Sequence, residues 1–345
     1  MNDTQLDLAF MADLPAPPTP VRPVRKPSRA RKVPAGVRAA EGQLPETEAE
    51  AHARALEAHP DYRVLRRLQP RLHWPEAAPG ADIRRLLVLD TETTGLDRVN
   101  DRIMELALLR VDVDAASGQP VGAVQVYDGL EDPGMPIPRE VQDITGITPA
   151  MVRGQALDEA RIAALLLGAD LVVAHNAGFD RPFVEARVPA FKDCAWACSV
   201  QDVPWKAYGR RSAKLESLAQ DQGWFYDAHR AEMDCHALLA VLTAPMGDHR
   251  ALAQVLERVR HPSYRLLATH APYDAKDRLK ARGYRWSTED KVWSIQLPDS
   301  TALEAEFAWL KDNAYQQRAA VVQFERLPAT ARYSGRPGVL MHHQL

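Results

Sequence analysis

The sequence predicts a mixed α/β fold, a five-stranded sheet with helices on both faces, followed by a small C-terminal α+β module. Two observations lead to this prediction. Three strand-like segments come first, and their short connections make them an antiparallel meander: 85–90, 102–112 and 121–128. Helical and strand-like segments then alternate as far as residue 243, which is typical of a sheet covered by helices.

The first strand is the apolar run RLLVLD at 85–90, typical of a central strand buried on both faces. Two later strands complete the sheet, at 170–174 and near 195–200. Helices are expected around 138–142, 149–154, 157–167, 178–187, 213–221 and 231–243. We expect a ligand site at the strand ends, where sheets of this kind bind their ligands.

The C-terminal module is expected to hold two helices, at 274–283 and 301–314, and a hairpin in which YRW pairs with KVWSI. Two further strands are expected, one at 264–270 and a last one at 320–327. Trp286 and Trp293 lie on the hairpin among several Lys and Arg residues. Two roles are open to them, a stacking platform for single-stranded bases or the core of the module, and burial statistics favour the core.

Composition divides the chain further. We expect a disordered Pro- and Arg-rich tail at 1–44 and a helical arm or linker at 45–80. The main α/β domain is expected at 81–248 and a linker helix at 249–261. The small module would follow at 262–330 and a second tail at 331–345.

Overall charge and cysteine content limit the cellular setting. The net charge is only −3, although seven Lys or Arg and no acid lie between Arg22 and Arg38. The three cysteines form an odd set without a secretory context, which favours reduced thiols and a cytoplasmic protein. No apolar run approaches the ~20 residues that cross a bilayer, so no membrane partner is expected.

Three short runs hold the residues from which chemistry is expected: DTETTGL at 90–96, HNAGFD at 175–180 and HRAEMD at 229–234. Asp90 and Glu92 end the first strand, and their spacing of two places both side chains on one face. Asp180 and Asp234 are each expected in the first turn of a helix, where an acid alone would be ordinary because it complements the helix dipole.

His229 precedes Asp234 by five residues, so the two cannot share one helical face and the histidine is expected on the loop before the helix. Carboxylates that gather in a folded core need a cation to hold them together. The four acids and the histidine therefore predict hydrolysis assisted by divalent metal ions.

Taken together, the runs D-x-E-x-T-G, H-N-x-x-F-D and H-x-A-x-x-D resemble the three motifs of the DEDDh 3′–5′ exonucleases over roughly 83–245. That family includes the proofreading epsilon subunit of bacterial DNA polymerase III and RNase T. The segment ITGITPAMV at 144–152 is also similar to the family, with Thr145 where a histidine is common. The resemblance implies an RNase H-like fold.

The resemblance further implies that four carboxylates bind two Mg²⁺ or Mn²⁺ ions: Asp90, Glu92, Asp180 and Asp234. It makes His229 the general base. The terminal nucleotide would be held by the backbone around Thr91 and Thr93 and by the ring of Phe179. The products would be nucleoside 5′-monophosphates from DNA 3′ ends, with single-stranded DNA favoured, in replication proofreading or repair.

Two alternatives stay open. The substrate is RNA in one of them, as in RNase T-like exoribonucleases. In the other, the chain is a non-catalytic nucleic-acid-binding or scaffold subunit, against which the presence of all five key residues argues.

The N-terminal peptide suggests a partner. Its motif resembles the short segment by which bacterial replication and repair proteins bind the sliding clamp, with contacts from Gln5, Leu6, Leu8 and Phe10. The basic stretch at 22–38 would add non-specific contact with nucleic acid, or would only keep the tail soluble.

Overall fold

The computed structural model describes residues 46–247 and 249–345. The chain divides into two units, 1–66 and 67–345, which are treated separately. In the described part of the first unit, helix α2 (Glu46–Glu57) ends before Pro60, and Arg66 forms ion pairs with Glu50 and Glu57. The predicted tail and the possible clamp-binding peptide lie outside the described residues.

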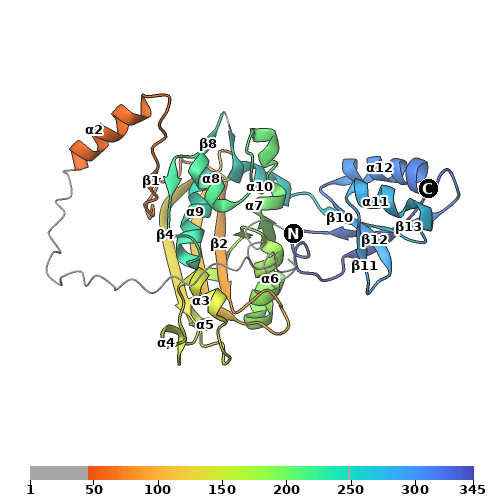
Figure 1. Ribbon diagram of the computed structural model, residues 1–345, viewed down its shortest axis with the longest axis horizontal. Helices are drawn as coiled ribbons and strands as arrows, with labels where there is room; N and C mark the ends of the chain where they lie inside the picture. Colours follow the sequence, from red (N-terminus) through yellow and green to blue (C-terminus); the bar gives the residue numbers. More distant parts are fainter. Residues whose placement is uncertain (1–45, 248) are drawn as a thin grey trace, which may run out of the picture. The chain divides into compact units, whose positions relative to one another are not determined.

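The second unit contains the predicted five-stranded sheet, in the order β4-β3-β2-β5-β6. Figure 1 labels two of its strands, β2 and β4. Its strands are β2 (Ile83–Thr93), β3 (Ile103–Asp114), β4 (Gln119–Leu130), β5 (Leu171–Ala174) and β6 (Trp196–Cys198). The first three pair antiparallel, whereas β5 is parallel to both β2 and β6. The predicted mixed α/β sheet is therefore confirmed.

Helices cover both faces of the sheet because β2 is apolar on both sides. Leu86 and Val88 pack into a core shared with helices α8 (Leu215–Asp221), α9 (Ala231–Thr243) and α10 (Ala251–Val259). Leu87 and Leu89 point the other way, into a core shared with α5 (Glu159–Leu166) and α6 (Ala177–Arg187). Side chains of β2 point alternately to the two faces of the sheet, so this alternation decides which helices contact each residue at the end of the strand.

Shorter elements connect these layers. Helices α3 (Arg139–Thr145) and α4 (Pro149–Val152) follow β4, and α7 (Ser199–Asp202) follows β6. The short strands are β1 (Arg66–Arg67), β7 (Trp224–Phe225), β8 (Pro245–Met246) and β9 (His249–Arg250). The three cysteines are free thiols, as expected. None of the helices in the described ranges has the length and apolar content needed to span a membrane.

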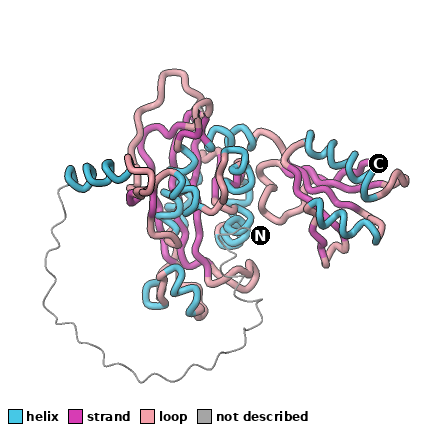
Figure 2. Tube along the Cα trace, turned by 45° about the horizontal axis from the view of Figure 1, so that its top comes forward, coloured by secondary structure: helices cyan, strands magenta, loops and turns pink. Residues whose placement is uncertain are grey.

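The C-terminal module is built on a second sheet, separate from the first (Figure 2). Its order is β11-β12-β10-β13-β14, and every neighbouring pair is antiparallel. Its elements are β10 (Ser263–Ala268), α11 (Lys276–Arg282), β11 (Arg285–Ser287), β12 (Val292–Leu297), α12 (Ser300–Trp309), β13 (Val321–Leu327) and β14 (Val339–Gln344).

Two expectations for this module need correction. The prediction that the strand at 320–327 is the last was wrong, because β14 pairs with β13 along Val321–Arg326. Its sequence VLMHHQ is largely exposed and lacks an alternating pattern, so only the pairing shows it. Of the hairpin tryptophans, Trp293 packs against the module core, whereas Trp286 is 48% exposed.

The segment between β13 and β14 joins the module to the first sheet. The backbone N–H of Trp196 in β6 donates a hydrogen bond to the carbonyl of Ala329. Arg181 in α6, which is fully buried, donates to the carbonyls of Thr330 and Arg332. The module is thus anchored on the helix that carries Asp180.

Candidate active site

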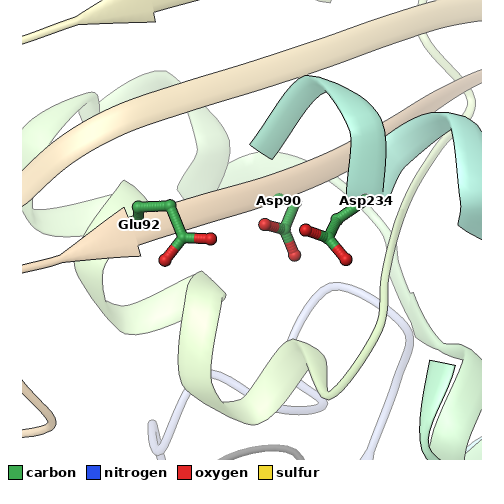
Figure 3. Close-up of side chains that lie close together, drawn as sticks. All are labelled: Asp90, Glu92 and Asp234. Carbon is green, nitrogen blue, oxygen red and sulfur yellow. The ribbon is translucent and has the colours of Figure 1, made fainter. Parts of the chain in front are cut away.

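Three of the predicted carboxylates meet at the end of β2. Asp90 and Glu92 share the face of Leu86 and Val88, and that face is covered by α9, whose first turn carries Asp234. One carboxylate oxygen from each of the three acids lies within 4.8 Å of the others (Figure 3). Two predictions, the shared face of Asp90 and Glu92 and the position of Asp234 in the first turn of a helix, therefore place three oxygen donors around one point.

Asp234 is held in place by neighbouring donors. The hydroxyl of Tyr226 donates to its Oδ1 atom at 3.0 Å, and the backbone N–H of Arg230 donates to Oδ2 at 3.2 Å. Tyr226 is itself buried, so its hydroxyl needs this acceptor. These two bonds orient Asp234 toward Asp90.

Asp180 lies in the first turn of α6, as predicted, and is 2% exposed. It is not part of the group within 4.8 Å. Instead, its Oδ1 atom accepts a hydrogen bond from the hydroxyl of Thr91 at 2.8 Å. The side chain of Thr91 points to the face of the sheet that carries Leu87 and Leu89, opposite to that of Asp90 and Glu92. Asp180 therefore approaches the end of β2 from that face. Its negative charge nevertheless raises the pKa of both Asp90 and Glu92.

Burial and mutual repulsion make this group of acids costly. Burial, followed by the charge of Asp234, raises the pKa of Asp90 and of Glu92 well above the ordinary values. Burial also raises the pKa of Asp234 to about 6 and that of Asp180 to about 7. Hydrogen bonds from Tyr226 and Thr91 oppose these two shifts. Oxygen donors that repel one another in this way fit a divalent cation, whose charge removes the repulsion.

His229 lies on the loop before α9, as predicted. Its backbone is in the left-handed region, with a φ of 64°, a conformation that non-glycine residues adopt infrequently. A charge on His229 lowers the pKa of Asp234, so the imidazole lies near this carboxylate. The structure therefore brings the histidine to the edge of the acidic group.

Glu105 and Arg230 fix this loop, and sequence reasoning missed both. Glu105 in β3 has no exposed surface, and its Oε1 atom lies 2.7 Å from Nη2 of Arg230. Its Oε2 atom accepts the backbone N–H of Ala231, the first residue of α9. One signal was available: Glu105 is a lone acid in the apolar run IMELALL, and a buried charge requires a partner.

The three residues predicted to contact the terminal nucleotide have different surroundings in the structure. The hydroxyl of Thr93 donates to the carbonyl of Gly95 at 2.6 Å, which shapes the turn after β2. Phe179 is half-buried, and its ring lies 5.0 Å from that of Phe183. The side chain of Thr91 is occupied by Asp180, so only its backbone is available for a nucleotide.

Comparison with known proteins identifies the family. The family model RNase_T, described as exonuclease, matches residues 87–242. DNA polymerase III subunit epsilon of Treponema pallidum is 28% identical over 173 residues, which are 46% of this chain and 75% of that protein. DNA polymerase III PolC-type of Clostridium perfringens is 28% identical over 153 residues, which are 43% of this chain and 10% of that protein.

Among solved structures, exonuclease X in complex with 5′ overhanging duplex DNA is 25% identical, with a TM-score of 0.35. The match covers 49% of this chain and 99% of that chain. The matched segment 87–242 contains all five residues named above from the three motifs, Asp90, Glu92, Asp180, His229 and Asp234. The α/β domain thus belongs to the RNase T (DEDDh) family of 3′–5′ exonucleases, hydrolases of phosphodiester bonds.

Proposed function

We propose that this protein is a metal-dependent 3′→5′ exonuclease that removes nucleoside 5′-monophosphates from DNA 3′ ends in replication proofreading or repair. The observation that carries the proposal is the meeting of Asp90, Glu92 and Asp234 within 4.8 Å at the end of β2. DNA is favoured over RNA because two of the relatives named above are DNA polymerase III proteins, the subunit epsilon and the PolC-type.

Asp90, Glu92, Asp180 and Asp234 would hold two Mg²⁺ or Mn²⁺ ions, which suit all-oxygen ligand sets. When bound, such ions supply positive charge that favours the ionisation of water and stabilises a leaving 3′-oxygen. In this proposal, Asp180 would turn from Thr91 toward the other three acids. Its hydrogen bond to Thr91 is a single neutral-donor contact, worth about 1.5–3 kcal/mol at most, which a cation can replace.

His229 would accept the proton of the attacking water, for which it must be neutral. The Glu105–Arg230 pair would hold the loop so that the imidazole stays over the acids. The backbone at Thr91 and Thr93 and the half-exposed ring of Phe179 would contact the terminal nucleotide.

The decisive experiment incubates 3′- and 5′-labelled DNA and RNA strands with the protein in Mn²⁺, Mg²⁺ or EDTA. Asp90→Ala is compared with Asp143→Asn, an exposed acid of α3 outside the acidic group. We expect stepwise release of mononucleotides from DNA 3′ ends that requires metal, is lost in Asp90→Ala and is kept in Asp143→Asn. Cleavage of RNA alone supports the exoribonuclease alternative. Cleavage in EDTA, or full activity of Asp90→Ala, contradicts the proposal.

The N-terminal peptide adds a partner to this proposal, a bacterial sliding clamp bound through Gln5, Leu6, Leu8 and Phe10. Its support is the sequence motif. Deletion of residues 1–12 should abolish co-elution with the clamp and leave exonuclease turnover intact. Substitution of Leu8 and Phe10 by alanine should do the same. Co-elution that persists in both variants ends this part of the proposal.

A further inference from the structure

A cavity of about 450 Å³ lies between the first sheet and the C-terminal module. Residues of both contribute to its wall, among them Gly178 of α6 and Leu297 of β12. Five of the lining residues are arginines: Arg98, Arg258, Arg265, Arg332 and Arg336. They come from three separate parts of the sequence, at 98, 258–265 and 332–336, so the cavity exists only in the folded chain.

The acids of the cavity do not balance these arginines. The lining residues include two carboxylates, Asp202 and Glu325, against five guanidinium groups, an excess of three positive charges. Asp202 is already bonded to Arg332 at 3.1 Å and to the hydroxyl of Tyr333 at 2.8 Å. Glu325 is bonded to Arg265 at 2.8 Å.

Outside the wall, Glu185 contacts Arg336 at 3.1 Å, but it also pairs with Arg181, which brings a further positive charge. The excess of positive charge is therefore not removed by this neighbour.

Several buried guanidinium N–H groups of the lining arginines lack an acceptor. Arg332 is 1% exposed, and its Nε and Nη2 atoms have no hydrogen-bond partner among the described residues. The Nε atoms of Arg265 and Arg336 are in the same situation. A buried donor without an acceptor costs about 1–3 kcal/mol, and more when it is charged. Burial and the nearby charge of Arg332 lower the pKa of Arg258, and the carboxylate of Asp202, 3.8 Å from its Nε atom, opposes this shift.

The cavity lies next to the candidate active site along the chain. Gly178 is two residues from Asp180, and Arg98 is on the loop that follows Asp90 and Glu92. The wall formed by 331–336 is anchored by Arg181, the residue after Asp180. The cavity wall thus shares helix α6 and the loop after β2 with the candidate active site.

We propose that this cavity is a phosphate-binding site for a nucleotide, in which Arg98, Arg258 and Arg332 contact the phosphate oxygens. Guanidinium groups suit this ligand because they donate paired hydrogen bonds to phosphate. The inference rests on the proposed function, since the phosphate belongs either to a strand bound in the active site or to a released mononucleotide.

The test measures binding without turnover, in EDTA. A 5′-fluorescein-labelled dT₁₂ strand is titrated by anisotropy at several salt concentrations, and dTMP and inorganic phosphate are titrated by calorimetry. The variants are Arg98→Gln, which changes an exposed side chain, and Arg258→Gln. Arg260→Gln is the matched control, because Arg260 lies two residues from Arg258 and is paired with Glu257 outside the cavity.

We expect each of the two variants to weaken binding about tenfold relative to the control. If the phosphate belongs to a strand, the affinity for dT₁₂ falls and the salt slope decreases by about 0.7 per lost contact. If it belongs to a free nucleotide, the affinities for dTMP and inorganic phosphate fall instead. Affinities for all three ligands that equal those of Arg260→Gln overturn the proposal.

These outcomes separate the two proposals. A wild-type protein that binds as expected but cleaves nothing would contradict the exonuclease and leave the phosphate site intact. Metal-dependent cleavage combined with unchanged binding in both variants would contradict the phosphate site alone.

Discussion

Glu105 and Arg230 form an ion pair, 2.7 Å between Oε1 and Nη2, that ties the loop of His229 to the second strand of the sheet. Glu105 is also the residue that faces Glu92 in the antiparallel pairing of β2 and β3. The same carboxylate thus contacts the start of α9, which carries Asp234, and lies beside a second acid of the site. The position of the loop that carries His229, the proposed general base, is set from β3.

Glu105→Gln should lower kcat, because the loop loses its charged anchor while the side chain keeps its size. We expect a loss of about 10- to 100-fold in activity, typical of residues that orient metal ligands. Unfolding free energy should fall by about 1–3 kcal/mol, since Arg230 is partly exposed and keeps solvent contact. Turnover as a function of Mn²⁺ concentration checks this. Glu140→Gln, an exposed acid of α3, is the control, and a kcat within twofold of it contradicts the positioning role.

Asp90→Asn should abolish cleavage and yet stabilise the metal-free protein. Loss of a metal ligand removes several kcal/mol of transition-state stabilisation, at least about 10³-fold in rate. The folded protein gains because a buried carboxylate that is repelled by Asp234, Asp180 and Glu92 becomes neutral. Thermal unfolding in EDTA at pH 7.5 checks the second effect. A lower Tm than that of the wild type would contradict the repulsion.

Stability without metal should fall as the pH rises from about 4 to 7. The folded protein raises the pKa of Asp234 to about 6 and of Asp180 to about 7, whereas unfolded carboxyls have the ordinary value of 3.8. Between those values the folded state binds more protons than the unfolded state, so a rising pH favours unfolding. A divalent cation should reverse this by stabilising the ionised forms.

Unfolding curves in EDTA and in Mn²⁺ across pH 5–8 measure this linkage. We expect the increase in Tm on adding Mn²⁺ to be larger at pH 8 than at pH 5. An increase that does not depend on pH would mean that these carboxyls do not bind the ion.

Arg181→Met should loosen the connection between α6 and the segment 328–336. The guanidinium has no exposed surface and bonds to Glu185 and to carbonyls of that segment. Its removal leaves a buried carboxylate without its main partner, at a cost of about 3–5 kcal/mol. Urea unfolding and limited proteolysis check this.

Arg187→Met is the control from the same helix, with a more exposed side chain that pairs with Glu131 and Glu159. Its cost should be about 1 kcal/mol. Equal stability of the two variants, without new cleavage at 328–336 in Arg181→Met, would show that Arg181 is not an anchor.

Local pattern was sufficient for most of the sheet domain. The apolar run ending in Asp90 predicts β2, and helix α9 has the predicted bounds, 231–243. The family motifs predicted which acids and which histidine belong to the site. Strands β2 and β4 were predicted too short at both ends; β2, for example, extends from Ile83 to Thr93. Strand ends depend on pairing with neighbours, which local periodicity does not report.

Folding alone decided which residues join these motifs. Glu105 meets Arg230 across 125 positions of sequence, and Thr91 meets Asp180 across 89. The edge strand β14 and the cavity of five arginines likewise arise only when distant segments meet. The amino-acid sequence by itself thus determined the helices, the strands and the types of reactive residue, because hydrophobic periodicity and helix starts are local properties. Partners, burial and the resulting pKa shifts were decided by tertiary contacts, because they depend on which surfaces exclude water together.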